Sequence, residues 1–328
     1  MRIDQLPTPC ALVDLDLLER NTERMAARAS RLGVRLRPHV KTHSCIEAAS
    51  LQTRGHFGGL TVSTLAEARA FAEAGFQDLT WAVPFAPASL QEALDLGRSV
   101  ERLSLLLDGE AALSELETAL AGRGKAPVWL KVDCGYHRAG VDPARPESEA
   151  LAARLVSSPA VDFRGLLTHA GHSYSCRTPE ELKVVARAER DVTVSFARRL
   201  REAGLEVPEV SVGSTPTLAV ADDLKGVTEV RPGNYVFFDA HQAAIGSCGL
   251  DEVAFSVLTS VISTSPHRGG ALIDAGALAL SKDRGAEHAD PLAGHGLVAD
   301  SVGRLREGWR VSALSQERPF GNSRHRRA

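Results

Sequence analysis

Three consecutive stretches, LSLLL (Leu103–Leu107), AALSELETAL (Ala111–Leu120) and VWLKV (Val128–Val132), carry the pattern that decides the fold. A short apolar run bounded by turn residues predicts a buried strand, and an amphipathic stretch between two such runs predicts a helix. Strand, helix and strand in succession predict an α/β fold.

The same alternation extends in both directions, from residue 35 to about residue 232. The predicted strands are Arg35–Val40, Gly59–Ser63, Leu79–Val83, Leu103–Leu107, Val128–Val132, Gly165–His169, Glu209–Val212 and Thr228–Arg231. The predicted helices include Leu65–Ala74, Ala111–Leu120, Pro146–Leu155 and Glu180–Ala203. About eight strand–helix units in roughly 200 residues are what a (β/α)8 TIM barrel requires. A doubly wound open sheet is the competing architecture.

The sequence after residue 251 has a different character. Val253–Thr264, Gly270–Asp274 and Trp309–Val311 are predicted as strands, and no convincing helix follows the first two. Ala11–Val13 is predicted to complete this β-rich region. We therefore expect a barrel domain over residues 15–245 and a second, mainly β domain over residues 246–317 plus 1–14, incomplete here. Residues 318–328 are expected to form a solvated basic tail.

Composition excludes several classes of protein. The 328 residues carry 38 Lys and Arg against 41 Asp and Glu, a formal charge of -3, which argues against a nucleic-acid partner. The chain shows neither an apolar run of membrane-spanning length nor a signal peptide. Its five cysteines are odd in number and lack CxxC pairing, which predicts reduced thiols. These features predict a soluble, cytoplasmic protein with no membrane partner.

The first unusual strand end is RPHVKTH, residues 37–43. A lysine at the inward-pointing end of a strand is costly to bury unless its charge is used or its pKa falls. Lysines with a lowered pKa form imines with carbonyl compounds, including pyridoxal phosphate, so Lys41 is a candidate nucleophile. The alternative is a surface lysine just beyond a strand.

Two further strand ends lead into polar loops. Residues 131–141 contain Arg138, which could bind a ring nitrogen or a carboxylate, or could pair with Asp133 to stabilise the loop. Residues 168–174 contain His169 and His172, which could ligate a metal ion or stack on a cofactor ring. Ordinary hydrogen-bonded loop histidines are the alternative.

The fourth strand end is SVGSTPT, residues 211–217, where glycine and hydroxyl side chains precede a proline suited to a first helical turn. Such a segment can bind a phosphate, and Pro232–Tyr235 would add backbone donors. A capped helix with no ligand is the alternative. Neither a Walker A motif nor a GxGxxG motif after the first strand is present, which argues against nucleotide use.

Together these segments resemble the fold-type III (alanine racemase-like) enzymes, which use pyridoxal 5'-phosphate, and more closely the D-serine dehydratase and D-threonine aldolase family. The motifs occur in family order over residues 7 to about 317: TPCALVD (8–14), RPHVKTH (37–43), VDCGYHRAGV (132–141), HAGHSY (169–174), VGSTPT (212–217) and PGNYVFFD (232–239).

The resemblance assigns roles to nine residues. It implies that Lys41 binds the cofactor covalently, that His169 stacks on the pyridine ring, and that Arg138 lies near the ring nitrogen or the substrate carboxylate. Tyr174 would line the pocket. The phosphate would be held by Gly213, Ser214, Thr215, Gly233 and Asn234.

The resemblance also implies a reaction. A D-3-hydroxyamino acid would lose its α-proton to Lys41, and D-serine dehydratase, which forms pyruvate and ammonia, is favoured over D-threonine aldolase. An amino-acid racemase is a further alternative. It is disfavoured because the three tyrosines, Tyr136, Tyr174 and Tyr235, all precede the second domain. A non-catalytic protein that binds pyridoxal phosphate is the last alternative. The resemblance also implies that this chain forms a homodimer.

The C-terminal segment departs from the family pattern. Leu314–Glu317 matches it, but Arg318 stands where a histidine is expected, and the His/Cys segment that binds zinc or manganese in the family is absent from this chain. We therefore expect no metal ligands here and interpret the ending as a truncation or frameshift.

Overall fold

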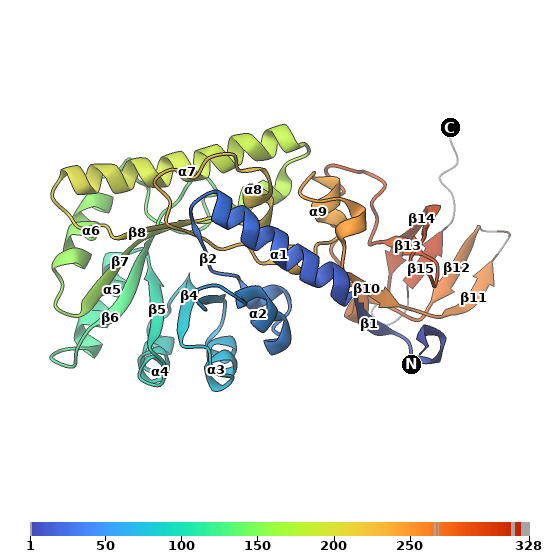
Figure 1. Ribbon diagram of the computed structural model, residues 1–328, viewed down its shortest axis with the longest axis horizontal. Coiled ribbons are helices and arrows are strands. Elements are labelled where there is room, and N and C mark those ends of the chain that lie inside the picture. The colour runs from blue at the N-terminus through green and yellow to red at the C-terminus, as the bar shows by residue number, and fades with distance from the viewer. Residues whose placement is uncertain (1, 266, 268, 316–318, 323–328) are drawn as a thin grey trace. The chain divides into compact units, whose positions relative to one another are not determined.

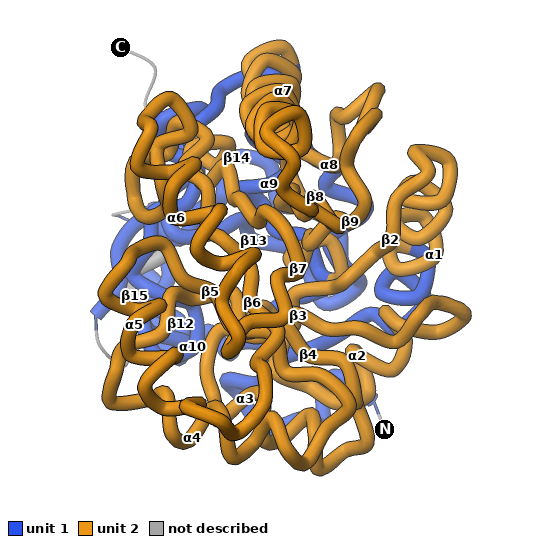
Figure 2. The backbone as a smooth tube through the Cα atoms, turned by 90° about the vertical axis from the view of Figure 1, so that its left-hand side faces the viewer, with its two compact units in different colours: residues 1–20, 175–179, 237–328 blue, residues 21–174, 180–236 orange. Residues whose placement is uncertain are grey.

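The computed structural model describes residues 2–265, 267, 269–315 and 319–322. It divides into two compact units (Figure 2). We call residues 21–174 and 180–236 the barrel unit, and residues 1–20, 175–179 and 237 onward the β-rich unit. Among the described residues, no helix is both long enough and apolar enough to cross a membrane.

Eight strands form the sheet of the barrel unit: β2 (Arg35–Leu36), β3 (Leu60–Val62), β4 (Asp78–Pro84), β5 (Arg102–Leu107), β6 (Ala126–Lys131), β7 (Val161–Leu167), β8 (Glu209–Val212) and β9 (Glu229–Val230). Their order is β2-β9-β8-β7-β6-β5-β4-β3, and every neighbouring pair is parallel. A parallel bridge between His39 and Thr61 joins the two ends of the sheet and closes the cylinder. The predicted barrel is confirmed, and the open sheet is wrong.

Helices lie outside this cylinder of strands (Figure 1). They are α1 (Leu15–Arg31, whose first six residues belong to the β-rich unit), α2 (Ile46–Thr53), α3 (Leu65–Glu73), α4 (Pro87–Gly97), α5 (Glu110–Ala119), α6 (Pro146–Ser157), α7 (Pro179–Glu202) and α8 (Thr215–Val220). Local signals set their ends. Thr64 and Glu67 form a capping box at α3, and a proline occupies the first turn of α4 and of α6. The four predicted helices are confirmed to within two residues at each end.

The β-rich unit contains two sheets. In the first, β1 (Cys10–Val13) pairs antiparallel with β10 (Phe255–Leu258), so the predicted N-terminal strand is confirmed. The second has the order β11-β12-β15-β14-β13 and is antiparallel throughout. Its strands are β11 (Val261–Ser265), β12 (Gly270–Ile273), β13 (Leu297–Ala299), β14 (Leu305–Leu314) and β15 (Pro319–Asn322).

Three expectations for this unit need correction. The single stretch Val253–Thr264 is two strands, β10 and β11, and a short helix α10 (Ala277–Leu280) follows β12. The backbone of residues 319–322 forms β15 rather than a solvated tail, because it pairs with both β12 and β14. The rest of that tail, residues 318 and 323–328, lies outside the described residues.

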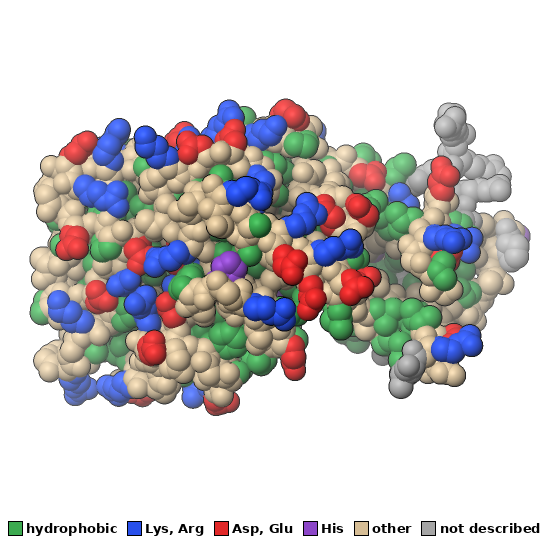
Figure 3. All heavy atoms as spheres, in the orientation of Figure 1, with side chains coloured by type: hydrophobic (Ala, Val, Ile, Leu, Met, Phe, Trp, Pro, Cys, Tyr) green, Lys and Arg blue, Asp and Glu red, His purple; other side chains and the backbone are tan. Residues whose placement is uncertain are grey.

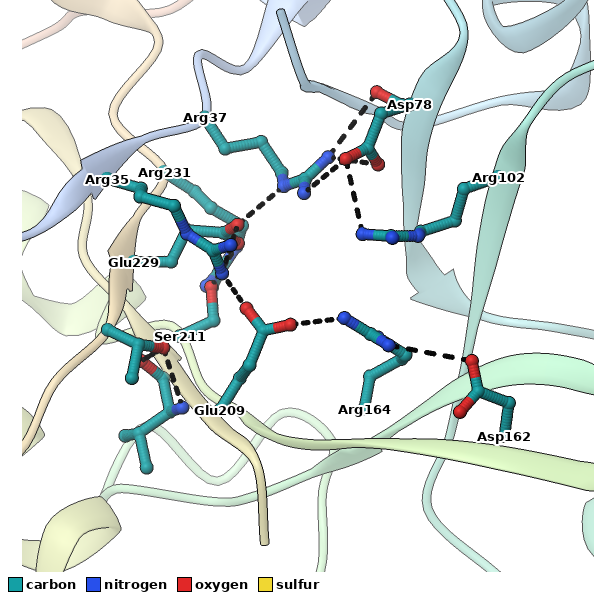
Figure 4. Close-up of polar contacts among 12 residues, drawn as sticks. Arg35, Arg37, Asp78, Arg102, Asp162, Arg164, Glu209, Ser211, Glu229 and Arg231 are labelled. Atoms are coloured by element: carbon teal, nitrogen blue, oxygen red, sulfur yellow. Dashed lines mark hydrogen bonds and ion pairs between the residues drawn. The ribbon is translucent and has the colours of Figure 1, made fainter. Parts of the chain in front are cut away.

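The amino ends of the barrel strands hold a network of paired charges that is buried at its centre (Figure 4). Arg37 is its centre: its Nε donates to Glu229 Oε2 at 2.7 Å and its Nη1 donates to Asp78 Oδ1 at 2.8 Å. Around it, Arg35 and Arg164 contact Glu209, Arg102 contacts Asp78, and Arg164 also contacts Asp162. The two carboxylates raise the pKa of Arg37 despite the opposing effect of burial. Each buried arginine at this end therefore has a carboxylate partner inside the chain.

Candidate active site at the carboxyl ends of the barrel strands

Lys41 lies in a short 3-10 helix, η2 (Val40–Thr42), that follows β2. Its backbone N–H donates to His39 Nδ1 at 3.4 Å. The side chain reaches solvent at the barrel mouth, yet partial burial lowers the pKa of Lys41, and the positive charge of Arg138 lowers it further against the opposing charge of Glu67. An accessible lysine with a lowered pKa has the properties of a nucleophile or a base.

His169 follows β7 and faces the same basic surroundings. Burial, and then the positive charges of Lys131 and Lys41, hold the pKa of His169 well below its ordinary range. The imidazole is therefore neutral at pH 7. Its ring meets the Tyr136 ring edge-on, with centroids 6.3 Å apart, and lies 6.5 Å from the Tyr174 ring.

Arg138 is exposed, and its guanidinium lies 5.0 Å from the centroid of the Tyr136 ring. The expected alternative, an ion pair between Arg138 and Asp133, is wrong. Asp133 instead accepts hydrogen bonds from the backbone of Gly135 and His137 and contacts His137 Nδ1 at 2.8 Å. The loop is thus held by Asp133 and His137, and Arg138 remains at the solvent boundary near Lys41.

Two cations at the mouth were not singled out from the sequence. Lys131 ends β6 and Arg231 follows β9, and both are almost fully buried. Burial lowers the pKa of Lys131 to about 8, helped by the charge of Arg231, and burial lowers the pKa of Arg231 to about 10. The sequence did contain a signal for Arg231. It lies two positions after Glu229 at the end of a buried strand, so the side chains of Glu229 and Arg231 point to the same face.

The glycine- and hydroxyl-rich loop after β8 is packed against the loop after β9. Ser214 caps α8 in a capping box with Thr217, and Thr215 Oγ1 accepts from the backbone N–H of Tyr235 at 3.1 Å. The helix predicted after this loop is therefore present and capped. Phosphate binding by Gly213, Ser214, Thr215, Gly233 and Asn234 stays a prediction. The structure brings these five residues together at the strand ends that also present Lys41 and His169.

Gly233 is required by the backbone that it touches. A Cβ at this position would lie 2.6 Å from the His39 carbonyl oxygen. A side chain here would push away the segment that carries Lys41. The sequence motif thus contains a glycine that sets the position of the lysine loop.

The mouth of the barrel unit is strongly basic. The charge interactions described above link Lys41, Lys131, Arg138, His169 and Arg231. The carboxylates whose charge acts on this group are Glu67, Glu189 and, at Arg231, Glu229. Such an excess of positive charge fits a bound anion, and an accessible lysine within it fits an aldehyde cofactor that carries a phosphate. These residues therefore fit pyridoxal phosphate.

Comparison with known proteins agrees with this arrangement. Residues 13–241 match the family model of the alanine racemase N-terminal domain, and residues 254–325 match the model of a putative serine dehydratase domain. The first match alone covers more than half of the chain. The chain belongs to the alanine racemase-like family that includes the D-serine dehydratases.

Individual members of this family resemble the chain over most of its length. D-threo-3-hydroxyaspartate dehydratase from Delftia sp. (strain HT23) is 43% identical over 95% of the chain and 82% of that protein. D-serine dehydratase from Dictyostelium discoideum is 38% identical over 87% of the chain and 76% of that protein. The solved structure of the Delftia dehydratase matches with a TM-score of 0.93 at 41% identity, and the match covers 98% of this chain and 85% of that one.

Proposed function

We propose that this chain is a pyridoxal-phosphate-dependent lyase that removes water from D-3-hydroxyamino acids. The observation that carries the proposal is Lys41, accessible at the barrel mouth, with a lowered pKa and surrounded by basic side chains. The motifs favour D-serine, which would give pyruvate and ammonia. The likeness to a D-threo-3-hydroxyaspartate dehydratase makes D-threo-3-hydroxyaspartate the second candidate substrate.

When bound, pyridoxal phosphate supplies an electron sink that stabilises negative charge at the Cα of an amino acid. Lys41 would hold it covalently, and the phosphate would lie against Gly213, Ser214, Thr215, Gly233 and Asn234. The lowered pKa of Lys41 leaves more neutral amine near pH 7, which suits it to take the Cα proton of the substrate.

The remaining basic residues divide by exposure. Arg138 is solvent-exposed, so it is suited to bind the carboxylate of an incoming amino acid through two parallel hydrogen bonds. Lys131 and Arg231 are buried, so they would act on the cofactor side of the pocket. His169 is neutral and flat and would stack on the cofactor ring, with Tyr174 beside it.

The test is a substrate panel. The chain is incubated with pyridoxal phosphate and with D-serine, D-threo-3-hydroxyaspartate, D-threonine or D-alanine. Pyruvate, oxaloacetate, acetaldehyde, glycine and L-alanine are measured. Pyruvate or oxaloacetate supports a dehydratase, and acetaldehyde with glycine supports the D-threonine aldolase alternative. Racemised D-alanine would support a racemase. A visible band of lysine-bound cofactor without any product would leave a non-catalytic binding protein.

Lys41→Ala provides the residue-level test. It should abolish the visible absorption of the bound cofactor and lower turnover by about 10²–10⁴-fold, the usual contribution of a positioned proton-transfer group. Exposed Lys125 in the same unit is the matched control, and Lys125→Ala should leave both readouts unchanged. A normal cofactor band in Lys41→Ala would contradict the proposal.

Metal binding finds no support in the described part of the chain. Its residues contain no group of three His, Cys, Asp or Glu placed to hold a metal ion, and His169 with His172 does not make one. We assign no described residue to a metal ion. Zinc or manganese dependence is tested by measuring turnover after chelation and after adding each ion back.

We further propose that the protein is a homodimer in the cytoplasm. Several large apolar side chains of the β-rich unit are exposed, among them Val261, Ile262, Val302 and Leu305, which favours association. The structure describes all five cysteines and joins none of them in a disulfide bond, which suits a reducing compartment. Light scattering tests the dimer, and cell fractionation tests the location.

A further inference from the structure

A line of hydrogen bonds crosses the interior of the barrel unit from the amino-end charge network to Arg231 (Figure 4). Arg231 Nη1 donates to the hydroxyl of Ser211. That hydroxyl donates to Glu229 Oε1 at 2.7 Å. The other oxygen of Glu229 accepts from Arg37 Nε at 2.7 Å. Arg231 is thus connected to the paired charges through one hydroxyl group.

Sheet register explains why these side chains meet. Ser211 and Glu229 are direct partners across the parallel strands β8 and β9. Arg231 lies two residues after Glu229, so its side chain points to the same face. Ser211 and Glu229 are fully buried, and Arg231 is nearly so. A polar group in this place needs a hydrogen-bonding partner, because leaving it unsatisfied costs stability.

Ser211 can connect Glu229 to Arg231 because of the hydrogen bonds that a hydroxyl group makes. It donates one hydrogen bond and accepts others, so it can serve a carboxylate and a guanidinium together. Both oxygens of Glu229 are engaged, one by Arg37 and one by Ser211. Arg231 therefore bonds to the hydroxyl and, through Nη2, to the backbone carbonyl of Thr168.

This arrangement orients Arg231 without a direct carboxylate contact. A carboxylate bound directly to the Arg231 guanidinium would neutralise its positive charge. The Ser211 hydroxyl and the Thr168 carbonyl fix the orientation of the guanidinium without neutralising it. The lowered pKa of Arg231, caused first by burial and only partly offset by Glu229 and Glu189, agrees with incomplete compensation. An anionic group bound at the mouth would benefit from that remaining charge.

We propose that Ser211 and Glu229 are positioning residues for Arg231, which they hold by a hydroxyl relay so that its charge serves the cofactor. This inference rests on the proposed function, since it assumes that the mouth binds pyridoxal phosphate. It assigns Ser211 a role two strand positions before the predicted phosphate loop and outside the set of residues predicted to touch the cofactor.

The decisive variant is Ser211→Ala, which removes both hydrogen bonds of the relay. Its affinity for pyridoxal phosphate, titrated by the visible band, should fall about 10- to 100-fold, as expected for lost hydrogen bonds to charged groups. The absorption maximum of the bound cofactor should also shift. Ser148 is the matched control, because it is a buried serine whose hydroxyl donates to the Asp142 carbonyl at 2.6 Å, outside the mouth. Ser148→Ala should change affinity less than twofold and leave the maximum in place.

A second pair of measurements separates the relay from local packing. Ser211→Cys keeps a similar volume but donates weakly, so it should weaken cofactor binding in the same direction even where Ser211→Ala folds poorly. Arg231→Lys should weaken binding in the wild-type background and add little in the Ser211→Cys background. Independent, multiplying effects of the two changes would overturn the relay.

The two levels of the proposal fail differently. Wild-type protein that shows no lysine-bound cofactor would refute the proposed function. Wild-type protein that binds the cofactor normally, together with Ser211→Ala and Ser211→Cys proteins that bind it with the same affinity and absorption maximum, would refute only the role of Ser211.

Discussion

The two ends of the barrel treat the same kinds of side chain in opposite ways. At the amino ends of the strands, Arg37 is buried against Glu229 and Asp78, and its pKa is raised. At the carboxyl ends, Lys131 and Arg231 are buried with few carboxylates nearby, and the pKa of each is lowered. Charges at the first end are balanced within the chain. Charges at the second end lack such matched partners, and the proposed function uses them to bind the anionic cofactor.

The surface gives a third environment for charge. On the face drawn in Figure 3, Lys and Arg side chains are interspersed with Asp and Glu. The Arg69–Glu92 pair on the barrel unit is typical, with an N–O distance of 2.8 Å and both side chains about half exposed. Such pairs are screened by water and salt, so they contribute little to either stability or function.

Removing a partner from the charge network at the amino ends of the strands should have the largest effect on stability. Arg37→Ala leaves Glu229 and Asp78 without their central partner, and removing one member of a buried pair costs about 3–5 kcal/mol. Urea unfolding can be followed by the fluorescence of Trp81 and Trp129, both in barrel strands, in a Trp309→Phe background. A fall in the free energy of unfolding of less than about 1 kcal/mol would show that Arg37 does not stabilise the two carboxylates as described.

Removing a buried charge at the carboxyl ends of the strands should instead raise the free energy of unfolding. Burial of Lys131 disfavours its charged form, so Lys131→Met should stabilise the cofactor-free protein by about 1–3 kcal/mol at pH 7. The pKa of Lys131 falls from 10.5 to about 8 on folding, so between these values the unfolded chain holds the proton more firmly. Wild-type stability should rise across that range, and the gain from Lys131→Met should fade there.

Urea midpoints of both proteins at pH 7 and pH 10 check this prediction. The difference between the two proteins should be largest at pH 7. A difference that grows toward pH 10 would mean that Lys131 is stabilised by a partner when charged. Lys125→Met is the control, because Lys125 is an exposed lysine of the same unit.

Arg138 should separate function from stability. It is exposed at the mouth, so Arg138→Gln should change the free energy of unfolding by no more than about 0.5 kcal/mol. If it binds the substrate carboxylate, KM should rise about tenfold, since one such lost contact is worth about 1.4 kcal/mol. Steady-state kinetics and a urea curve on the same preparation provide the comparison. An unchanged KM would remove Arg138 from the substrate site.

The smallest effect is expected at the surface. Arg69→Ala should cost about 0–1 kcal/mol, and that cost should shrink further in high salt. The urea midpoint at low and high ionic strength measures it. If Arg69→Ala lowered the free energy of unfolding as much as Arg37→Ala, solvent exposure would not explain the difference between surface and buried ion pairs.

Sequence patterns predicted the barrel because its strands are short, apolar and regularly spaced between amphipathic helices. They also marked Lys41 and His169, since both are polar groups just beyond buried strands. They gave no residue bounds for helices α1, α2 and α4, and they placed the final described strand in a solvated tail. Residues 319–322 carry little local strand signal, and their partners β12 and β14 are distant in sequence.

The charge network could not be foreseen for a related reason. Arg37, Ser211, Glu229 and Arg231 each interrupt an apolar run, so a single sequence shows four isolated polar residues. Their meaning comes from registers across β2, β9 and β8, which no local pattern contains. The tight packing at Gly233 could not be predicted either, because only the structure shows the His39 carbonyl that a side chain would meet.

The position of β15 determines the order in which the strands of the β-rich unit can pair as the chain folds. Residues 319–322 lie between β12 and β14, in the middle of a five-stranded sheet. During synthesis on a ribosome, β11 can fold back on β12, and β13 on β14, but the two hairpins have no common neighbour until the last of these segments emerges. Each would meanwhile present an unpaired edge, so this sheet should be the part of the nascent protein most dependent on chaperones.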